Sequence, residues 1–264
     1  MTSTYKHIGL TLSGGGTKGL AHAGVLKYLD DHGFTPSQIA GSSAGAIVGA
    51  LYAFGQTPEQ ILEFFKSIYF FHWRHFTLKK PGLIDSHSFQ PYFNTIFGDT
   101  RIGDLPLKLH ITATDMVKGK LRIFGPETRI TDAVLASAAV PGMMCPYEID
   151  GNLYSDGGIL NHFPADVLQG RCDHLIGVYV SPVQDIEAKD LNSIKSVMSR
   201  AVELLTAHSN TQKFNLCDRI IIPEGLWQFG TFETNKAKMD AIFESGYQAA
   251  IASFEAETKN AVSL

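Results

Sequence analysis

Cysteine is scarce in this sequence, with only Cys145, Cys172 and Cys217 among 264 residues. An odd number of widely separated cysteines excludes a disulfide-rich secreted scaffold, and their spacing matches no metal-ligand motif. We therefore expect three reduced, mostly buried thiols in a cytoplasmic protein.

Long apolar runs are also missing. The longest stretch free of charged and strongly polar side chains covers residues 44–55, and its twelve residues fall short of the ~20 that a membrane-spanning helix needs. Residues 1–9 lack the basic region and apolar run of a secretory signal. We expect a protein that does not cross a membrane and whose contact with one, if any, is peripheral.

The sequence has no excess of basic charge. Its 22 lysines and arginines against 26 aspartates and glutamates give a formal net charge of −4. A nucleic-acid-binding protein needs a basic stripe to meet phosphates, so we expect no nucleic-acid partner. Charged residues make up only 18 % of the chain and hydrophobic residues 44 %, which excludes intrinsic disorder for most of it.

What the chain does have is an alternation of short apolar runs with helical periodicity. Strands are expected at 7–13, 38–41, 107–114, 119–124, 174–180 and 219–223, and helices at 20–32, 44–54, from 57 onward, at 191–208 and at 236–254. Strands that alternate with helices predict an α/β fold, a three-layer α/β/α sandwich with a mostly parallel sheet. No linker or repeat divides the chain, so we expect a single domain over residues 1–264.

A glycine-rich loop lies between the first expected strand and its helix. It contains Gly14, Gly15 and Gly16, followed by Lys18 and Gly19. Successive glycines allow backbone N–H groups to converge on one point, and the following helix adds the partial positive charge of its N-terminus. Such a loop suits a phosphate or a developing oxyanion.

The same loop also spells the G-x-G-x-x-G pattern of dinucleotide-binding folds. That fold requires an acidic residue at the end of the second strand, where residues 40–43 read Ala-Gly-Ser-Ser. The nearby acids, Asp30 and Asp31, lie on the preceding helix instead. A phosphate-binding P-loop requires Ser or Thr after Lys18, and Gly19 stands there. Both alternatives are disfavoured.

A second motif follows the second expected strand. Ser43 is the central residue of a G-x-S-x-G pattern whose glycines are Gly41 and Gly45, with Ser42 as its neighbour. Glycines two residues on either side relieve crowding, so the serine can occupy a strained, exposed turn between a strand and a helix. The pattern alone is weak, and its strand–turn–helix context strengthens it.

Two further segments are unremarkable alone. Asp156, Gly157 and Gly158 form a D-G-G sequence, which is common in turns. Residues 136–141 read A-S-x-x-x-P, a run of small residues that ends in proline and predicts a helix terminus.

In this order, G-G-G-x-K-G, G-x-S-x-G, A-S-x-x-x-P and D-G-G with N-x-F-P just after it resemble the patatin-like phospholipase family. The resemblance covers residues 8–164, and four blocks in the right order make it specific. It implies a patatin-like fold and a serine hydrolase that cleaves acyl esters of glycerolipids, as a phospholipase A or a lysophospholipase-type esterase. It also implies a lipid substrate and no metal or cofactor.

The resemblance assigns roles residue by residue. Ser43 becomes the nucleophile and Asp156 its general base, without a catalytic histidine, and the amides of Gly14, Gly15 and Gly16 form the oxyanion hole. The residues that match supporting positions of the motifs are Lys18, Gly19, Gly41, Gly45, Gly157 and Gly158.

Elementary chemistry agrees with a Ser–Asp dyad. A serine hydroxyl is a poor nucleophile until a neighbouring base accepts its proton. An aspartate with an ordinary pKa of ~3.9 is a weak base at neutral pH, so the site should desolvate it. We expect an apolar cleft for the acyl chain nearby, lined by residues from 44–54 and 61–76.

Two other functions remain open. An acyltransferase could use the same acyl-enzyme, although related carrier transacylases have G-H-S-x-G, and Ser42 replaces that histidine here. A non-catalytic lipid- or anion-binding module could retain the glycine loop, although the presence of both Ser43 and Asp156 argues against it. The sequence leaves the oligomeric state open.

Several other residues have a structural and a functional interpretation. We expect structural roles for His22, Ser137 and Ser155. For His162, a structural role is favoured over the alternative that it lines the cleft. The aromatic segment 69–76 could be a cap that dips into a lipid interface, but packing against the core is favoured. The apolar faces of helices 191–205 and 236–254 are expected in the core or, alternatively, at a dimer surface.

Overall fold

The computed structural model of the chain describes residues 7–262 except for 69–71, 73–74, 78–79, 195, 199, 202 and 205–211. In the described residues, one eight-stranded sheet has the order β5-β6-β3-β2-β1-β7-β8, with β4 paired to β3 beside this path. The strands are β1 (Ile8–Leu12), β2 (Pro36–Ser42), β3 (Lys108–Asp115), β4 (Lys120–Ile123), β5 (Tyr147–Ile149), β6 (Asn152–Asp156), β7 (His174–Val178) and β8 (Arg219–Ile221).

The centre of the sheet is parallel. β1 pairs in parallel with β2 on one side and with β7 on the other, and the parallel pairing continues to β3 and to β8. The strands that follow β1 in the sequence, β2 and β3, therefore lie on one side of it, and β7 and β8, which come much later, lie on the other side. In open α/β sheets, ligands bind where the strand order reverses, at the carboxyl ends of the strands.

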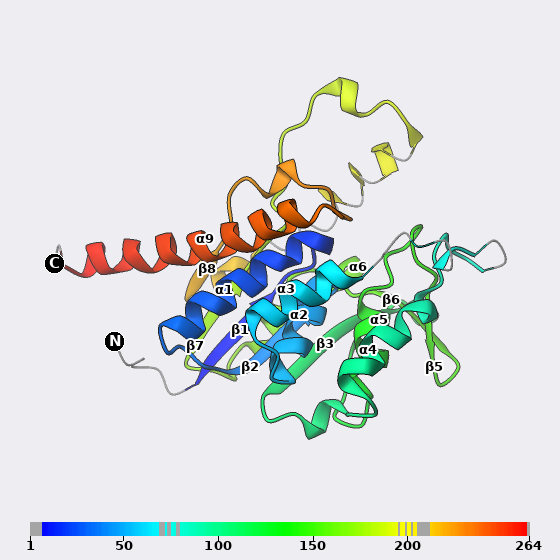
Figure 1. Cartoon of the computed structure of the whole chain (residues 1–264), viewed down its shortest axis with the longest axis horizontal. Coiled ribbons are helices and arrows are strands. Elements are labelled where there is room, and N and C mark those ends of the chain that lie inside the picture. The colour runs from blue at the N-terminus through cyan, green and yellow to red at the C-terminus, as the bar shows by residue number, and fades with distance from the viewer. Residues whose placement is uncertain are drawn as a thin grey trace.

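Helices cover both faces of the sheet, which confirms the predicted three-layer arrangement (Figure 1). One face carries α1 (Leu20–Asp31), α2 (Ala44–Ala53), α3 (Pro58–Ser67), α4 (Gln90–Phe97), α5 (Ile130–Ser137) and α9 (Lys236–Val262). The other face carries the one-turn helices α6 (Gly158–Asn161) and α7 (Ala165–Leu168). Short 3₁₀ turns lie at η1 (Gly16–Gly19), η3 (Ser86–Phe89), η4 (Ile102–Asp104), η5 (Ala188–Asp190), η6 (Gln212–Leu216) and η7 (Leu226–Gln228).

The start of α3 follows from its sequence. Thr57 accepts a hydrogen bond from the Gln60 backbone N–H, and the Gln60 side chain accepts one from the Thr57 backbone N–H. Pro58 at the first helical position needs no hydrogen-bond acceptor. This reciprocal cap confirms the predicted helix start, and α3 then runs back toward the carboxyl edge of the sheet (Figure 1).

β3 is longer than its parallel neighbour. Its first half pairs with β2, and its second half pairs antiparallel with β4 and, on the opposite side, with β6. Because Ser42 and Ile123 both pair with Thr112, the hairpin of β3 and β4 continues past the carboxyl end of β2. The predicted strand at 119–124 is thereby confirmed as a neighbour of the strand at 107–114.

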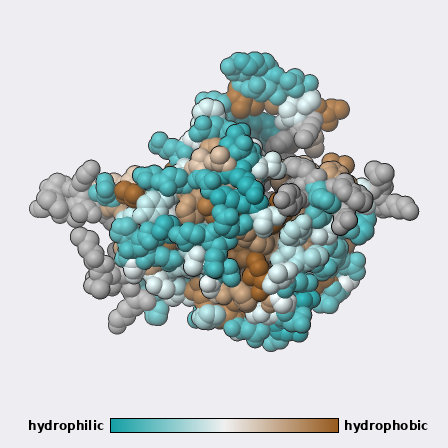
Figure 2. Space-filling model, in the orientation of Figure 1, coloured by the Kyte–Doolittle hydropathy of each residue, from teal (hydrophilic) through white to brown (hydrophobic). Residues whose placement is uncertain are grey.

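One packing expectation is wrong. The described residues from η5 onward to residue 204 project from the molecule at the upper right of Figure 1, and apolar patches are visible on this part in Figure 2. Of its described apolar side chains, Ile194 is 87 % exposed and Met198 is 60 % exposed, so they do not pack into the core. Residues 195, 199, 202 and 205–208 of the predicted helix lie outside the described residues. Among the described helices, none is both long and apolar enough to span a bilayer.

The apolar face of α9 lies in the core, as its periodicity predicted. There α9 packs against α1, and the two helices approach closely through glycine (Figure 1). A Cβ atom on Gly24 would lie 1.9 Å from the carbonyl oxygen of Phe243, and one on Gly246 would lie 2.0 Å from that of Ala21. This contact holds the C-terminal helix against the helix that follows the glycine loop.

We expect Gly24→Ala to lower the free energy of unfolding by about 1–2 kcal/mol. Overpacking costs about 1–3 kcal/mol, and a backbone carbonyl cannot move aside as a side chain can, so the cost exceeds the roughly 1 kcal/mol that alanine gains in helix propensity. Urea denaturation measures the difference. Gly230→Ala is the control because no atom lies within 4 Å of its Cβ position. Equal stability of Gly24→Ala and the wild type would contradict this helix contact.

Candidate active site

The glycine loop follows β1 at the carboxyl edge of the sheet. The N–H of Gly14 donates a hydrogen bond to the carbonyl oxygen of His162 at 3.0 Å. The N–H groups of Gly15 and Gly16 make no hydrogen bond within the described part of the chain. Of the three amides expected to bind an oxyanion, two are therefore available and that of Gly14 is already used.

The loop is held from the C-terminal part of the chain. The Thr17 backbone N–H donates to the carbonyl oxygen of Thr231 at 2.8 Å, and its hydroxyl donates to that of Glu233 at 3.3 Å. A Cβ atom on Gly16, whose φ is +59°, would lie 2.2 Å from the Thr231 oxygen. The segment before α9 thus fixes the loop, and only glycine fits at this point of it.

Ser43 lies in a strained turn between β2 and α2. Its φ of 53° and ψ of −120° are rarely adopted by a residue with a side chain. Gly41 and Gly45 allow this turn, because a Cβ atom on Gly41 would lie 2.4 Å from the Gly45 oxygen and one on Gly45 would lie 2.3 Å from the Leu12 oxygen. The backbone N–H of Ser43 donates to Oγ of Ser137 at 2.8 Å.

Asp156 ends β6, two strands away from β2 in the sheet. Its Oδ2 accepts a hydrogen bond from Ser43 Oγ at 2.6 Å, and its Oδ1 accepts one from the Gly158 backbone N–H at 2.7 Å. Burial raises the pKa of Asp156 to about 6, although both hydrogen bonds stabilise the carboxylate. The two residues are 113 positions apart in the chain.

The remaining motif residues surround these three loops. Gly19 contacts Ala44 at the start of α2, and Gly157 contacts Thr112 of β3. Burial lowers the pKa of Lys18, and the carboxylate of Glu203 partly opposes this shift. Lys18 does not line the pocket beside Ser43.

The two histidines near the site pack against its loops. His22 Nε2 is 2.8 Å from the Ser13 carbonyl oxygen, and burial lowers its pKa to about 4. Burial also lowers the pKa of His162 to about 4, and its ring packs against Gly14 and Gly158. His162 is not among the residues that line the pocket beside Ser43.

The end of α5 joins the serine turn to the aspartate turn. Ser137 Oγ accepts the Ser43 N–H, while its carbonyl oxygen accepts the Gly157 N–H at 3.2 Å. The carbonyl oxygen of Ala139 accepts the Asp156 N–H and the Ser155 hydroxyl, each at 2.9 Å. Ser137 therefore positions both the serine turn and the aspartate turn. A run of small residues does not by itself reveal this role, but the place of Ser137 in the A-S-x-x-x-P motif is a signal for it.

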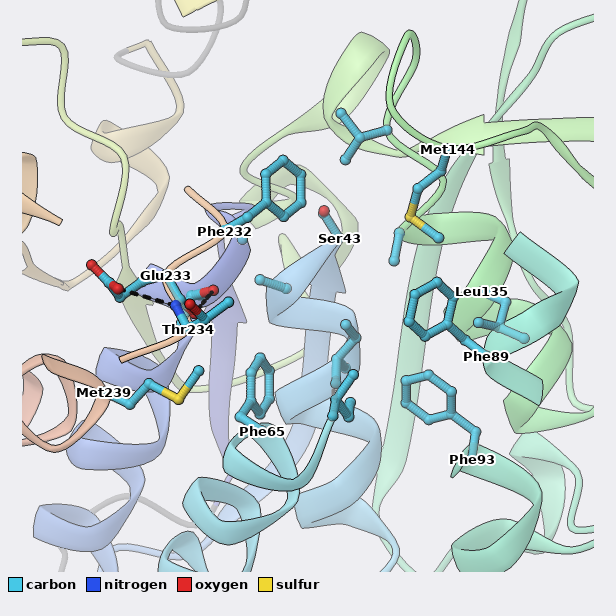
Figure 3. Close-up of a pocket in the computed structure, with 17 residues that line it drawn as sticks. Ser43, Phe65, Phe89, Phe93, Leu135, Met144, Phe232, Glu233, Thr234 and Met239 are labelled. Atoms are coloured by element: carbon cyan, nitrogen blue, oxygen red, sulfur yellow. Dashed lines mark hydrogen bonds between the residues drawn. The ribbon is translucent and has the colours of Figure 1, made fainter. Parts of the chain in front are cut away.

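An apolar pocket opens beside Ser43, which lies between Phe232 and Met144 (Figure 3). It has a volume of about 100 Å³. As expected, α2 and the helix after it contribute to the wall, and η3, α4, α5 and the segment before α9 complete it. The large apolar side chains are Ile47, Phe65, Ile68, Phe89, Phe93, Leu135, Val140, Met144, Phe232 and Met239.

The described parts of the aromatic segment lie outside this pocket. His75 is buried and stacks on Phe89, as packing predicts, whereas Phe76 is exposed. Residues 69–71 and 73–74 lie outside the described residues.

Cys145 is a buried free thiol, and Cys172 and Cys217 are partly buried free thiols. Within the described part of the chain, no three His, Cys, Asp or Glu side chains could together hold a metal ion.

We expect Ser137→Ala to destabilise the protein by about 1 kcal/mol more than Ser155→Ala. Losing Ser137 Oγ leaves the buried Ser43 N–H without an acceptor, which costs about 1–3 kcal/mol. Losing the Ser155 hydroxyl leaves the Ala139 oxygen still bonded to the Asp156 N–H, so only about 0.5–1.5 kcal/mol is lost. Denaturant unfolding of both variants is the measurement. The reverse order would contradict the role given to Ser137.

Comparison with known proteins finds a family model and relatives with similar sequences. The sequence model of the patatin-like phospholipase family matches residues 10–168. An uncharacterised NTE family protein of Mycobacterium tuberculosis is 32 % identical over 203 residues, which cover 71 % of this chain and 53 % of that protein. Lysophospholipase NTE1 of Eremothecium gossypii is 31 % identical over 207 residues, which cover 73 % of this chain and 13 % of that protein.

A solved structure has a similar fold. VipD from Legionella pneumophila superposes with a TM-score of 0.54 at 14 % identity, covering 96 % of this chain and 67 % of VipD. The chain spans about half the length of the mycobacterial relative and a smaller part of the fungal one. With the family model matching residues 10–168, the chain belongs to the patatin-like phospholipase family.

Proposed function

We propose that this chain is a lipid acyl hydrolase in which Ser43 is the nucleophile and Asp156 the general base. The observation that carries the proposal is the 2.6 Å hydrogen bond from Ser43 Oγ to Asp156 Oδ2. A base works best when its pKa lies near the working pH, and burial brings the pKa of Asp156 to about 6. The carboxylate is still mostly ionised at neutral pH, yet it is a far better proton acceptor than an exposed aspartate.

The proposed reaction has two stages. Asp156 takes the hydroxyl proton as Ser43 Oγ attacks the ester carbonyl, and the tetrahedral oxyanion accepts hydrogen bonds from the free N–H groups of Gly15 and Gly16. When the C–O bond of the leaving alcohol breaks, Asp156 returns the proton to it. Water then attacks the acyl-enzyme with Asp156 again as the base, which releases the fatty acid and restores Ser43.

The pocket supports an acyl chain as the group next to Ser43. Its wall is almost entirely aliphatic and aromatic, and its volume is about 100 Å³. A relative bears the name lysophospholipase, which supports a glycerolipid with a single acyl chain as the substrate class.

We expect Ser43→Ala to lose at least about 10³-fold in kcat on p-nitrophenyl butyrate, because no other group can form the acyl-enzyme. Ser42→Ala is the matched control. Its hydroxyl is buried one residue away and makes no hydrogen bond in the described structure, so its loss should change kcat less than about 3-fold. Quantifying the fatty acid released from lysophospholipid micelles extends the comparison to a lipid.

Each other outcome of this experiment has a definite meaning. Activity of Ser43→Ala equal to the wild type would disprove the assignment of the nucleophile. An inactive wild type that still binds lipid would favour the non-catalytic module. Transfer of the acyl group to an added alcohol in preference to water would favour the acyltransferase.

Asp156 should also control the pH dependence of catalysis and of stability. We expect kcat/KM to fall below an apparent pKa of about 6, where the base becomes protonated. Because burial raises the pKa of Asp156 above its unfolded value, its favourable contribution to stability is complete below pH 4 and is lost as the pH rises through 6. Two pKa units correspond to about 3 kcal/mol.

Asp156→Asn should therefore be inactive yet more stable than the wild type at pH 8, by up to about 3 kcal/mol, with the difference vanishing near pH 4. Parallel urea titrations at pH 4, 6 and 8 measure this convergence. A stability difference that does not change with pH, or a kcat/KM profile flat between pH 5 and 8, would be incompatible with Asp156 as the base.

A further inference from the structure

We infer that the aromatic end of the pocket beside Ser43, formed by Phe65 and Phe93, determines how long an acyl chain the site accepts. Both side chains line the pocket, and Figure 3 shows them at the end away from Ser43. The inference rests on the proposed function and deepens it, because it assigns esters of short acyl chains as the preferred substrates.

The pocket extends along α2 for one helical turn. Ser43 precedes the first residue of α2, and Ile47, one turn later, also lines the pocket. Leu51, a further turn along the same face, is completely buried and does not line it. Because an α-helix rises about 1.5 Å per residue, the four residues from Ser43 to Ile47 correspond to a depth of about 6 Å.

The walls formed by α3 and α4 end in the same way. α4 lines the pocket with Phe93, one turn after Phe89, but not with Phe97, which lies a further turn along. α3 lines it with Phe65, but not with Ile61, which lies one turn farther from the carboxyl edge of the sheet. Ile61 and Phe97 are at most 2 % exposed, so packed side chains close the pocket below this level.

The ring of Phe93 is held in place by other aromatic rings. Its centroid lies 5.2 Å from that of Phe64 and 6.2 Å from that of Phe97. The Phe97 ring in turn packs edge-on against Phe54, with centroids 5.2 Å apart. Since such ring pairs add to the stability that burial provides, an acyl chain that reaches Phe93 cannot move its ring aside without losing these contacts. Esters of longer chains therefore react less efficiently.

The test compares kcat/KM for p-nitrophenyl octanoate with kcat/KM for p-nitrophenyl butyrate. We expect the wild type to favour the butyrate ester. Phe93→Leu shortens the side chain at the end of the pocket, so about two further methylene groups of the octanoate enter it. At about 4-fold in affinity for each buried methylene group, the octanoate-to-butyrate ratio should rise about 10-fold.

Ile47→Phe changes the pocket in the opposite direction. The larger side chain fills space at the depth where the pocket ends, which excludes at least one methylene group of the octanoate. The octanoate-to-butyrate ratio should therefore fall at least about 4-fold below that of the wild type. A loss of folded protein lowers both rates alike, so it cannot produce opposite shifts of this ratio in the two variants.

Phe97→Leu is the matched control. It makes the same chemical change as Phe93→Leu, one turn farther along α4, at a ring that stacks with Phe93 but does not line the pocket. No methylene group of the substrate gains or loses burial in this variant, so the ratio should stay within about 2-fold of the wild type.

Binding without turnover separates this inference from the proposed function. Methyl butyrate and methyl octanoate are uncharged esters, and titration calorimetry measures their affinities for Ser43→Ala proteins that carry the same changes. We expect the ratio of the two affinities to follow the same order among the variants. If the wild type cleaves no ester while these affinities follow that order, the proposed function fails and the role of the aromatic end is supported.

An octanoate-to-butyrate ratio that neither Phe93→Leu nor Ile47→Phe changes would overturn the inference. An equal shift on Phe97→Leu would overturn it as well, because the ratio would then respond to the packing of α4 rather than to the length of the pocket. A wild type that hydrolyses the octanoate ester more efficiently than the butyrate ester would also contradict it.

Discussion

The hydrogen bond between Ser43 and Asp156 is the interaction on which the arrangement of the site depends. Its partners come from the ends of β2 and β6, which are separated in the sheet by β3. Each residue lies directly at the end of its strand, so the sheet places Ser43 Oγ 2.6 Å from Asp156 Oδ2. The parallel centre and its antiparallel extension are therefore both needed, one for the serine and the other for the aspartate.

Strain and desolvation at the dyad are offset by contacts around it. Ser43 adopts an unfavourable backbone conformation, and ionising Asp156 in a buried site costs free energy at neutral pH. The end of α5 fixes both turns through Ser137 and Ala139. Because these contacts use backbone groups that would otherwise be buried without partners, they stabilise the fold and the geometry of the proposed dyad at the same time.

The sequence predicts local features of this protein better than long-range ones. Apolar runs predict the parallel strands because burial on both faces leaves a continuous signal, and glycine spacing predicts the turn at Ser43. The bond from Ser43 to Ser137 joins residues 94 positions apart, so no local pattern contains it. Periodicity at 191–208 identifies an apolar face but not its surroundings, which is why exposure of Ile194 and Met198 was not foreseen.

The same limit explains why the glycine loop differs from its simplest interpretation. Three consecutive glycines suggest three equivalent donors, but the Gly14 N–H is bonded to His162 in the turn after Asp156. That bond ties the glycine loop to the aspartate turn, while Thr17 ties the loop to the segment before α9. In the proposed mechanism an amide used in this way does not bind the oxyanion, and it positions the two amides that do. Since an oxyanion hole acts through donors held in place before the reaction, giving up one donor to orient two others is consistent with the catalytic requirement.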